Sequence, residues 1–310
     1  MSGVSKAGAD LQAIEGLGPR PGGARVSLPR WMITLARRKV ALGGAVVAVA
    51  MAVIGALAPV IAGDPGHMDV AGRLTAPSRS HWFGTDDLGR DVFARVIYGA
   101  RLSLLVGAAV VGLSFVVGLA CGLVAGYYRR LDNAVMRVMD GLMAFPAIVL
   151  AIALMAALGP SVTNVVVAIA VVYSPRVARV VRGSVLVIRE TVYVEAARAL
   201  GASDVALIGR HILPNCLSPV IVQGSFVFAA AVLTEAALSF LGVGVPPYVP
   251  SWGNVLSEGR LYLQQAPWLV LYPGGAIMLT ILGLNLFGDG LRDLLDPKIR
   301  GLATERQRAT

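Results

Sequence analysis

Long apolar runs without charge alternate with shorter polar segments along the chain. Val40 to Gly63, Leu102 to Tyr128 and Gly141 to Pro175 contain no charged residue. A membrane-spanning helix needs about 20 mostly apolar residues, so the third run is too long for one crossing. We divide it at Gly159-Pro160-Ser161, because Gly and Pro interrupt helices. The pattern predicts an all-α integral membrane protein with six transmembrane helices, near residues 40–62, 102–128, 135–158, 162–182, 217–241 and 267–288.

The composition agrees with a membrane location. Of the 310 residues, 56% are hydrophobic and 15% are charged, and the mean hydropathy is +0.72. A soluble globular chain carries about 25% charged residues, so much of this surface faces something other than water. The first apolar run begins only at Val40 and is longer than the core of a signal peptide, so we expect a retained anchor. Cys121 and Cys216 are expected to pack as small apolar side chains.

The net charge of +9 is spread unevenly over the two sides of the predicted spans. If the N-terminus lies inside, most basic residues fall in inner segments. Because Lys and Arg concentrate in cytoplasmic loops, we expect both termini in the cytoplasm. Most of these residues then anchor the protein at the lipid bilayer, and we expect no nucleic acid partner. The outer basic residues are Arg73, Arg79, Arg90, Arg95, Arg101 and Arg260.

The predicted membrane domain, residues 30–300, is flanked by two tails. Residues 1–29 are rich in Gly, Pro and Ala and lack helical periodicity, so we expect a disordered cytoplasmic tail. Residues 301–310 form the second cytoplasmic tail, and residues 30–39 resemble an amphipathic lead-in with Trp31 at the interface.

The longest inner connection contains two predicted short helices. We call residues 190–214 the elbow. Residues 190–200 are good helix formers, and Gly201 can take the left-handed conformation that ends a helix. Ser203 or Asp204 can cap a second helix, which Pro214 is expected to end. Such an elbow offers a compact surface to a partner protein.

The residue types that common enzyme classes need are scattered. None of the three lysines follows a Gly-rich phosphate-binding turn. The three histidines do not cluster with other ligands as a zinc site requires, and no serine lies in a Gly-x-Ser-x-Gly motif. The sequence therefore predicts no enzyme, no catalytic residue, no metal site and no cofactor bound by this chain.

The elbow contains Glu195-Ala196-Ala197, with Gly201 six residues after the glutamate and Pro214 thirteen residues after that glycine. This pattern resembles the EAA loop of ABC-importer permeases. His211 stands where many members have Ile, which is typical of the dipeptide/oligopeptide branch. Four further stretches resemble the C-type (DppC/OppC-like) permease of the dipeptide/oligopeptide/nickel importer family, at residues 83–91, 234–242, 250–253 and 288–297. The elbow residues that match the EAA loop are Glu195, Ala196, Ala197, Gly201, Leu213 and Pro214.

The resemblance covers residues 30–300 and implies the MetI-like permease fold of a type I ABC importer in the bacterial plasma membrane. It implies a second, homologous permease subunit and two ATP-binding subunits or one fused ATPase, which bind ATP and Mg. It also implies an extracellular or periplasmic solute-binding protein. The elbow would couple ATP binding to a switch of the pathway from inward- to outward-facing. The implied coupling residues are Glu195, Ala196, Ala197, Gly201, His211, Leu213 and Pro214.

The two outer segments, residues 64–100 and 242–266, are longer than a connection between neighbouring helices requires, and long ordered loops tend to be functional. In the first, Thr85 or Asp86 is placed to cap a helix over residues 88–98. We expect these segments to meet the solute-binding protein or the partner permease. Candidate contacts are Asp86, Asp87, Arg90 and Trp252.

Several polar residues lie inside predicted spans, where they line a pathway or bond between helices. Glu235 is the most costly, and we expect it to be paired. At the inner side we expect an Arg137–Asp140 ion pair, and we expect Arg176, Arg179 and Arg182 to anchor the protein at the membrane interface. Candidates for the pathway or for intersubunit contacts are Glu235, Asn164, Gln223, Ser225 and Asn285.

Three functions remain open at this point. The first is a permease that imports dipeptides or oligopeptides. The second keeps the fold but carries nickel or glutathione, because the binding protein selects the cargo. The third is a channel or carrier that needs no ATPase, although such a protein has no use for a docking elbow.

Overall fold

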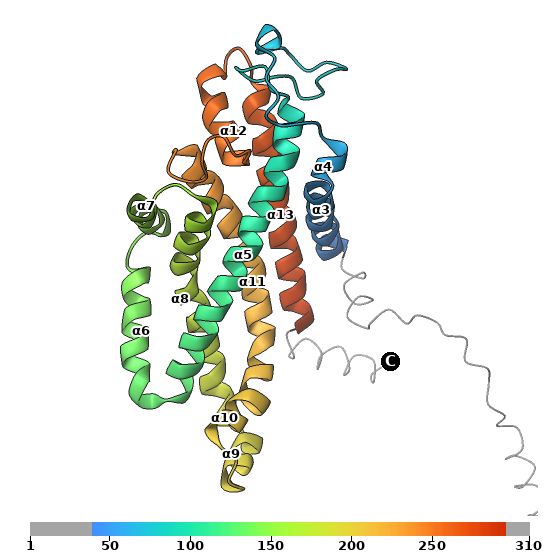
Figure 1. Ribbon diagram of the computed structural model, residues 1–310. Coiled ribbons are helices and arrows are strands. Elements are labelled where there is room, and N and C mark those ends of the chain that lie inside the picture. Colours follow the sequence, from blue (N-terminus) through green and yellow to red (C-terminus); the bar gives the residue numbers. More distant parts are fainter. Residues whose placement is uncertain (1–38, 296–310) are drawn as a thin grey trace, which may run out of the picture.

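The computed structural model describes residues 39–295, and it is a bundle of helices in that range (Figure 1). The predictions for the tails 1–29 and 301–310, and for Trp31, lie outside the described residues. Short helical turns cover Val70–Gly72, Leu207–Ile212 and Arg260–Tyr262. The α-helices are α3 (Lys39–Ala56), α4 (Ala58–Ile61), α5 (Val92–Tyr127), α6 (Arg129–Met143), α7 (Ala147–Leu158), α8 (Val162–Ile188), α9 (Val192–Ala199), α10 (Asp204–Ala206), α11 (Leu213–Phe240), α12 (Trp252–Gly259) and α13 (Trp268–Leu295).

Five helical segments within the described range are long and apolar enough to cross a membrane, and α6 with α7 makes a sixth if the bent pair is one span. One end of the bundle carries α12 and the segment that precedes α5, and the opposite end carries α9 and α10 (Figure 1). We call these the α12 end and the elbow end. With 36 residues, α5 is about 54 Å long, so it connects the two ends.

Glycines at four-residue intervals bring α5 against α8. A Cβ on Gly122 would lie 2.6 Å from the carbonyl oxygen of Ala178 and 2.6 Å from the Cβ of Val181. Because lipid is as apolar as the side chains, membrane helices associate through such close packing rather than through the hydrophobic effect. The same contact is made at three levels, between Gly118 and Val177, Gly122 and Val181, and Gly126 and Val185.

The predicted helix near 135–158 is broken. Residues 129–143 form α6, and α7 starts after Pro146 at an angle of 92° to it. Proline restricts the residue before it to extended conformations and donates no backbone hydrogen bond, which accounts for the break. By contrast, Pro175 lies inside the continuous helix α8, which runs to Ile188 rather than to 182.

Ion pairs join α6 to α8. The predicted Arg137–Asp140 pair is wrong, because the Asp140 carboxylate accepts a hydrogen bond of 2.7 Å from Arg179. Arg182 contacts both carboxylate oxygens of Asp132, at 2.5 and 2.7 Å. Arg176 lies over the ring of Tyr173 at 5.0 Å. The three arginines on α8 therefore bind within the chain, and two of them hold the amphipathic helix α6 in place.

The helix predicted over 88–98 and the span predicted over 102–128 are one helix, α5. Neither Thr85 nor Asp86 caps it. The side chain of Asp91 does, accepting from the backbone N–H of Phe93 at 3.3 Å. The Asp86 carboxylate accepts instead from the N–H groups of Leu88 and Arg90, at 2.9 Å each, so it shapes the turn that leads into the helix.

The second helix of the elbow does not stop at Pro214. It continues from Asp204 through a π-helical turn, Leu207–Ile212, into α11, which has Pro214 in its first turn. Proline has no N–H to donate, and the π-helical turn changes the hydrogen-bond pattern just before it, so the helix continues past Pro214. The N–H of Leu213 reaches back to the carbonyl of Ile208, which widens the turn. The elbow is thus continuous with a membrane-spanning helix.

Replacement of Gly122 by Leu should separate α5 from α8. The added side chain would collide with backbone and with a β-branched residue, and overpacking of this kind costs about 1–3 kcal/mol. We expect a lower midpoint of thermal unfolding in detergent. Gly112→Leu is the matched control on the same helix, because a Cβ there meets no atom within 4 Å. Equal shifts for both variants would contradict the packing role of Gly122.

Candidate functional site

The elbow is built as two helical pieces around a left-handed glycine. Helix α9 ends at Ala199, and Gly201 has φ of +85°, a conformation that only glycine adopts without strain. The hydroxyl of Ser203 then accepts from the N–H of Ala206 and caps the next helix. The predicted glycine and one of the two predicted caps are therefore confirmed.

Apolar side chains project from the elbow at the end of the bundle. Leu200 is 89% exposed, and Val192 and Val205 are each 81% exposed. Val192 and Leu200 lie outside the candidate membrane spans, and Val205 lies in the first turn of the candidate span Asp204–Phe240. Exposed apolar groups that are clustered and surrounded by charge mark sites of protein association. The surface includes Glu195, Ala196 and Gly201, which are exposed, and Ala197, which is half-buried.

The elbow is fastened to the end of α5 by polar contacts. The hydroxyl of Tyr127 donates to Asp204 at 2.6 Å, and the guanidinium of Arg198 lies 5.9 Å from the centre of the Tyr127 ring. Arg189 donates to the backbone carbonyl of Gly126 at 2.7 Å. The elbow is therefore attached to α5 as well as to α11.

The other predicted coupling residues lie where the elbow joins α11. His211 and Leu213 are half-buried and Pro214 is exposed. The ring of His211 lies 6.3 Å from that of Tyr193, and Asn215 donates to the carbonyl of His211 at 2.7 Å. Within the elbow, His211 and Leu213 are thus partly covered by the chain itself, and their coupling role stays a prediction.

The α12 end contains a buried network of four charged side chains. Arg95, which is 2% exposed, donates to Asp86 at 2.6 Å and to Glu258 at 3.0 Å. Arg90 donates to the same carboxylates, at 2.6 Å to Asp86 and 2.8 Å to Glu258. Two arginines and two carboxylates thus join the segment before α5 to α12. Asp86, Asp87 and Glu258 also lie close enough together to suggest a metal site, but Asp86 and Glu258 are already paired with the two guanidinium groups.

Two of the predicted docking contacts are corrected by their burial. Asp86 and Trp252 are both 0% exposed. The Trp252 indole donates to the carbonyl of Val96 at 2.9 Å, so it holds α12 against α5. Neither side chain reaches a partner in this conformation. Arg90 is largely buried as well, while Asp87 keeps part of its side chain exposed, so the docking prediction stays open for Asp87.

Of the pathway candidates, Glu235 is enclosed within this chain. It is 0% exposed and accepts from Ser103 at 2.7 Å and from Ser239 at 2.9 Å. The expected pairing is therefore with two hydroxyl groups, on α5 and on its own helix. Hydrogen bonds of this kind are what makes a buried carboxylate tolerable in a membrane.

Asn164 and Ser225 are likewise used within the chain. The amide of Asn164 donates to the carbonyls of Leu158 and Gly159, at 2.8 and 3.0 Å, and closes the turn between α7 and α8. Ser225 donates to Val222 at 2.8 Å and lies where a Cβ on Gly288 would collide with it. Asn285 is half-buried on α13.

Gln223 lines a large cavity. The cavity, of about 680 Å³, lies between α8, α11 and α13 near the elbow end. Ser218, Asn215 and Arg292 contribute further polar groups to its wall. The side chain of Gln223 thus faces open space beside polar groups, and its role in a pathway stays a prediction.

Sequence reasoning missed four residues of these sites. Arg95 and Glu258 were not predicted to belong to a site. Arg95 lies just before the apolar run that starts at Leu102, and a charged residue so close to a membrane span is often paired or functional. Tyr127 and Arg198 gave no signal of their contact, because the pairing depends on how the elbow folds back onto α5. The two contacts, Arg95–Glu258 and Tyr127–Arg198, join residues that are 163 and 71 positions apart in the sequence.

The network at the α12 end predicts that Asp86→Asn is destabilising. Removing one charge leaves Arg90 and Arg95 partly uncompensated, and breaking a buried ion pair costs about 3–5 kcal/mol. We expect a clearly lower thermal unfolding midpoint. Asp87→Asn is the control, because its only ion pair is long, at 3.9 Å, and partly exposed, which is worth about 1 kcal/mol or less. Equal stability of the two variants would refute the structural role of Asp86.

Comparison with known proteins identifies the family to which this architecture belongs. A family model described as "Binding-protein-dependent transport system inner membrane component" matches residues 97–301. A peptide transport system permease protein of Brucella suis is 51% identical over 267 residues, covering 86% of this chain and 90% of the relative. A dipeptide transport system permease protein of Alkalihalophilus pseudofirmus is 46% identical over 268 residues, covering 86% and 88%.

A third relative carries a different cargo in its name. It is a glutathione transport system permease protein of Pectobacterium atrosepticum, 46% identical over 225 residues, covering 72% of this chain and 75% of the relative. The family match and the relatives extend over most of the membrane-spanning bundle and the elbow. The chain therefore belongs to the family of inner membrane components of binding-protein-dependent transport systems.

Proposed function

We propose that this chain is a permease subunit of an ATP-driven ABC importer for dipeptides or oligopeptides. Two relatives that match it over 86% of its length are named as peptide and dipeptide permeases. The observation that carries the proposal is the elbow, which presents Leu200, Val205 and Glu195 beyond the end of the bundle. A surface of this kind suits a separate protein that drives the permease.

The elbow is proposed to dock onto an ATP-binding subunit. Exposed Leu200 and Val205 supply apolar anchors, and Glu195 offers a negative charge to a basic groove. The chain lacks a phosphate-binding loop, so ATP and Mg would be bound by the partner. Two such subunits, or one fused ATPase, would act on this permease and on a second, homologous one.

The contacts of the elbow provide a route for the coupling. When the ATPases close, the elbow would be displaced, and the continuous path through Leu207–Ile212 would carry the displacement into α11. The bond from Tyr127 to Asp204 would carry it into α5. Because α5 runs to the opposite end of the bundle, a tilt at the elbow would reach the network around Arg95. The pathway between the two permeases would then switch from inward- to outward-facing.

The orientation follows from the charge distribution and from the role of the elbow. We assign the elbow end and both termini to the cytoplasm, because Lys and Arg concentrate in cytoplasmic loops. The α12 end then faces outward, where a solute-binding protein would deliver the cargo. Trp82 and Tyr248, which are 64% and 84% exposed at that end, are aromatic groups of the kind enriched at protein interfaces.

The cargo is the less constrained part of the proposal. A relative with 46% identity is named for glutathione, which is itself a tripeptide, so a peptide-like solute fits all three relatives. Nickel remains an alternative cargo, because the motifs resemble those of the dipeptide/oligopeptide/nickel importer family. A channel or carrier without an ATPase is disfavoured, because the apolar surface of the elbow would then face water without a function.

The proposal is tested by uptake into proteoliposomes. We expect uptake of a labelled dipeptide only when this chain is reconstituted with its partner permease, the ATPase subunits, the binding protein and ATP. The chain alone should transport nothing and bind no ATP. Uptake by the isolated chain would refute the importer and favour a channel or carrier. Uptake of nickel or glutathione instead of a dipeptide by the full complex would keep the mechanism and change the cargo.

The bond between Tyr127 and Asp204 should matter for coupling. Tyr127→Phe removes the hydroxyl but keeps the ring beside Arg198, so the complex should assemble with normal basal ATP hydrolysis. We expect the stimulation of hydrolysis by loaded binding protein, and the uptake per ATP, to fall several-fold. Tyr128→Phe is the control, because the neighbouring ring makes no hydrogen bond through its hydroxyl within the described residues. Normal stimulation in Tyr127→Phe would show that α5 does not receive the movement in this way.

A further inference from the structure

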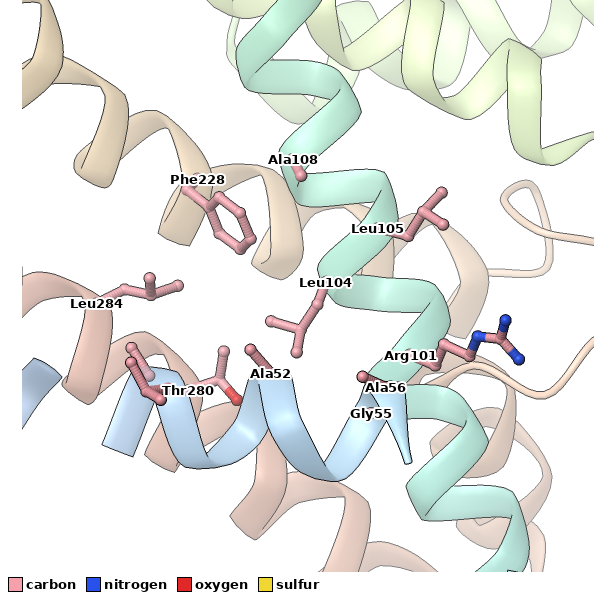
Figure 2. A pocket seen from close by; sticks show the side chains of 12 residues that line it. Ala52, Gly55, Ala56, Arg101, Leu104, Leu105, Ala108, Phe228, Thr280 and Leu284 are labelled. Atoms are coloured by element: carbon pink, nitrogen blue, oxygen red, sulfur yellow. The ribbon is translucent and has the colours of Figure 1, made fainter. Parts of the chain in front are cut away.

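An open apolar groove runs between α3, α5 and α13, away from the elbow and from the charged network. Its volume is about 650 Å³, and Figure 2 shows its side chains converging from these helices and from α11. All the helices that form it are candidate membrane spans, so the groove lies at the depth of the bilayer. Its apolar wall includes Ala52, Leu104, Ala108, Phe228 and Leu284.

Two close helix crossings explain why the groove exists. A Cβ on Gly55 would lie 3.0 Å from the backbone nitrogen of Arg101, so α3 touches α5 there. A Cβ on Gly44 would lie 2.7 Å from the carbonyl oxygen of Gly283, so α3 touches α13 there. The two glycines are separated by about 16 Å along the helix. Between the two crossings, small residues such as Ala48 and Ala52 do not fill the space between the helices.

Arg101 lies at the end of the groove that is nearer to α12. Its side chain is exposed, and within residues 39–295 it forms no ion pair. In Figure 2 its guanidinium points away from the apolar interior. Arg101 precedes Tyr127 by about 39 Å along α5, and a bilayer with its headgroups is about 40–45 Å thick. With Tyr127 in the headgroup region of one leaflet, this separation puts the guanidinium at the level of the lipid phosphates in the leaflet at the α12 end.

We propose that the groove is a binding site for one phospholipid, with an acyl chain between α3, α5 and α13 and the phosphate on Arg101. A guanidinium without a carboxylate partner, at the end of an apolar groove, is complementary to a molecule with an anionic head and a hydrocarbon tail. Arginine recognises phosphate through paired, charge-assisted hydrogen bonds. The neighbouring arginines Arg90 and Arg95 are already paired with carboxylates, whereas Arg101 has no carboxylate partner within residues 39–295 and is free to bind a phosphate.

The lipid would complete the packing of α3. This helix contacts the bundle through α13 and α5, and most of its side chains are not buried in the chain. An acyl chain in the groove would contact Val49 and Ala52 of α3 on one side and Leu104 and Leu284 on the other. A bound lipid would thereby hold α3 in a fixed position against α5 and α13.

Native mass spectrometry can test the site. The full chain, purified with the subunits that accompany it, is delipidated in detergent and titrated with dioleoylphosphatidylglycerol. We expect one tightly retained lipid per copy of this chain. Arg101→Gln should weaken retention about tenfold, because the charge-assisted contact with the phosphate is lost. Ala52→Phe, which fills the groove, should weaken lipid retention to a similar extent. Arg79→Gln, a change of an exposed arginine outside the groove, should have no effect.

Two results would overturn the proposal. One is unchanged lipid retention in both Arg101→Gln and Ala52→Phe. The other is efficient cross-linking of Ala52→Cys to a helix of another subunit, because a protein helix would then occupy the groove. Unfolding midpoints are measured for each variant. If Ala52→Phe does not fold, Leu105→Trp at the exposed edge of the groove replaces it.

Discussion

The structure depends on one constraint: a lipid bilayer offers no water to hydrogen-bond polar groups. The backbone must therefore satisfy its own hydrogen bonds, which inside a single membrane-spanning segment only a helix allows. The same constraint acts on side chains. Ser174 and Thr280 donate to carbonyls one turn earlier in their own helices, and Glu235 is closed in by two serines. Helices in the middle of the bundle meet through glycine and valine instead of through charge.

Charged and strongly polar interactions consequently gather at the two ends. At the α12 end, two arginines and two carboxylates bind the start of α5 to α12. At the elbow end, Tyr127 and Asp204 bind the end of α5 to the elbow, and Arg182 binds α8 to α6. The long helix α5 belongs to both networks. In the proposed mechanism, such a connection would carry a displacement of the elbow end along α5 to the α12 end.

The corrections to the sequence-based expectations share a cause. Asp86 and Trp252 resemble surface residues in the sequence, since the first is charged and the second lies in a loop rich in Pro and Gly. Both are buried because two outer segments, far apart in sequence, fold onto each other. Asp140 pairs with Arg179 rather than with Arg137 because α6 packs along α8. In each case a partner on another helix replaces the partner that was nearest in sequence.

The sequence by itself determined the features that depend on local chemistry. Apolar runs of spanning length predict the membrane helices, a glycine followed by a capping serine predicts the turn of the elbow, and the EAA-like pattern predicts the family. The tertiary structure alone decided which polar groups meet. Arg95 with Glu258, Tyr127 with Asp204, and the groove between Gly44 and Gly55 all arise from the way helices cross. Helix formation is governed by residues within a few positions of each other, whereas crossings depend on the packing of segments that the sequence leaves far apart.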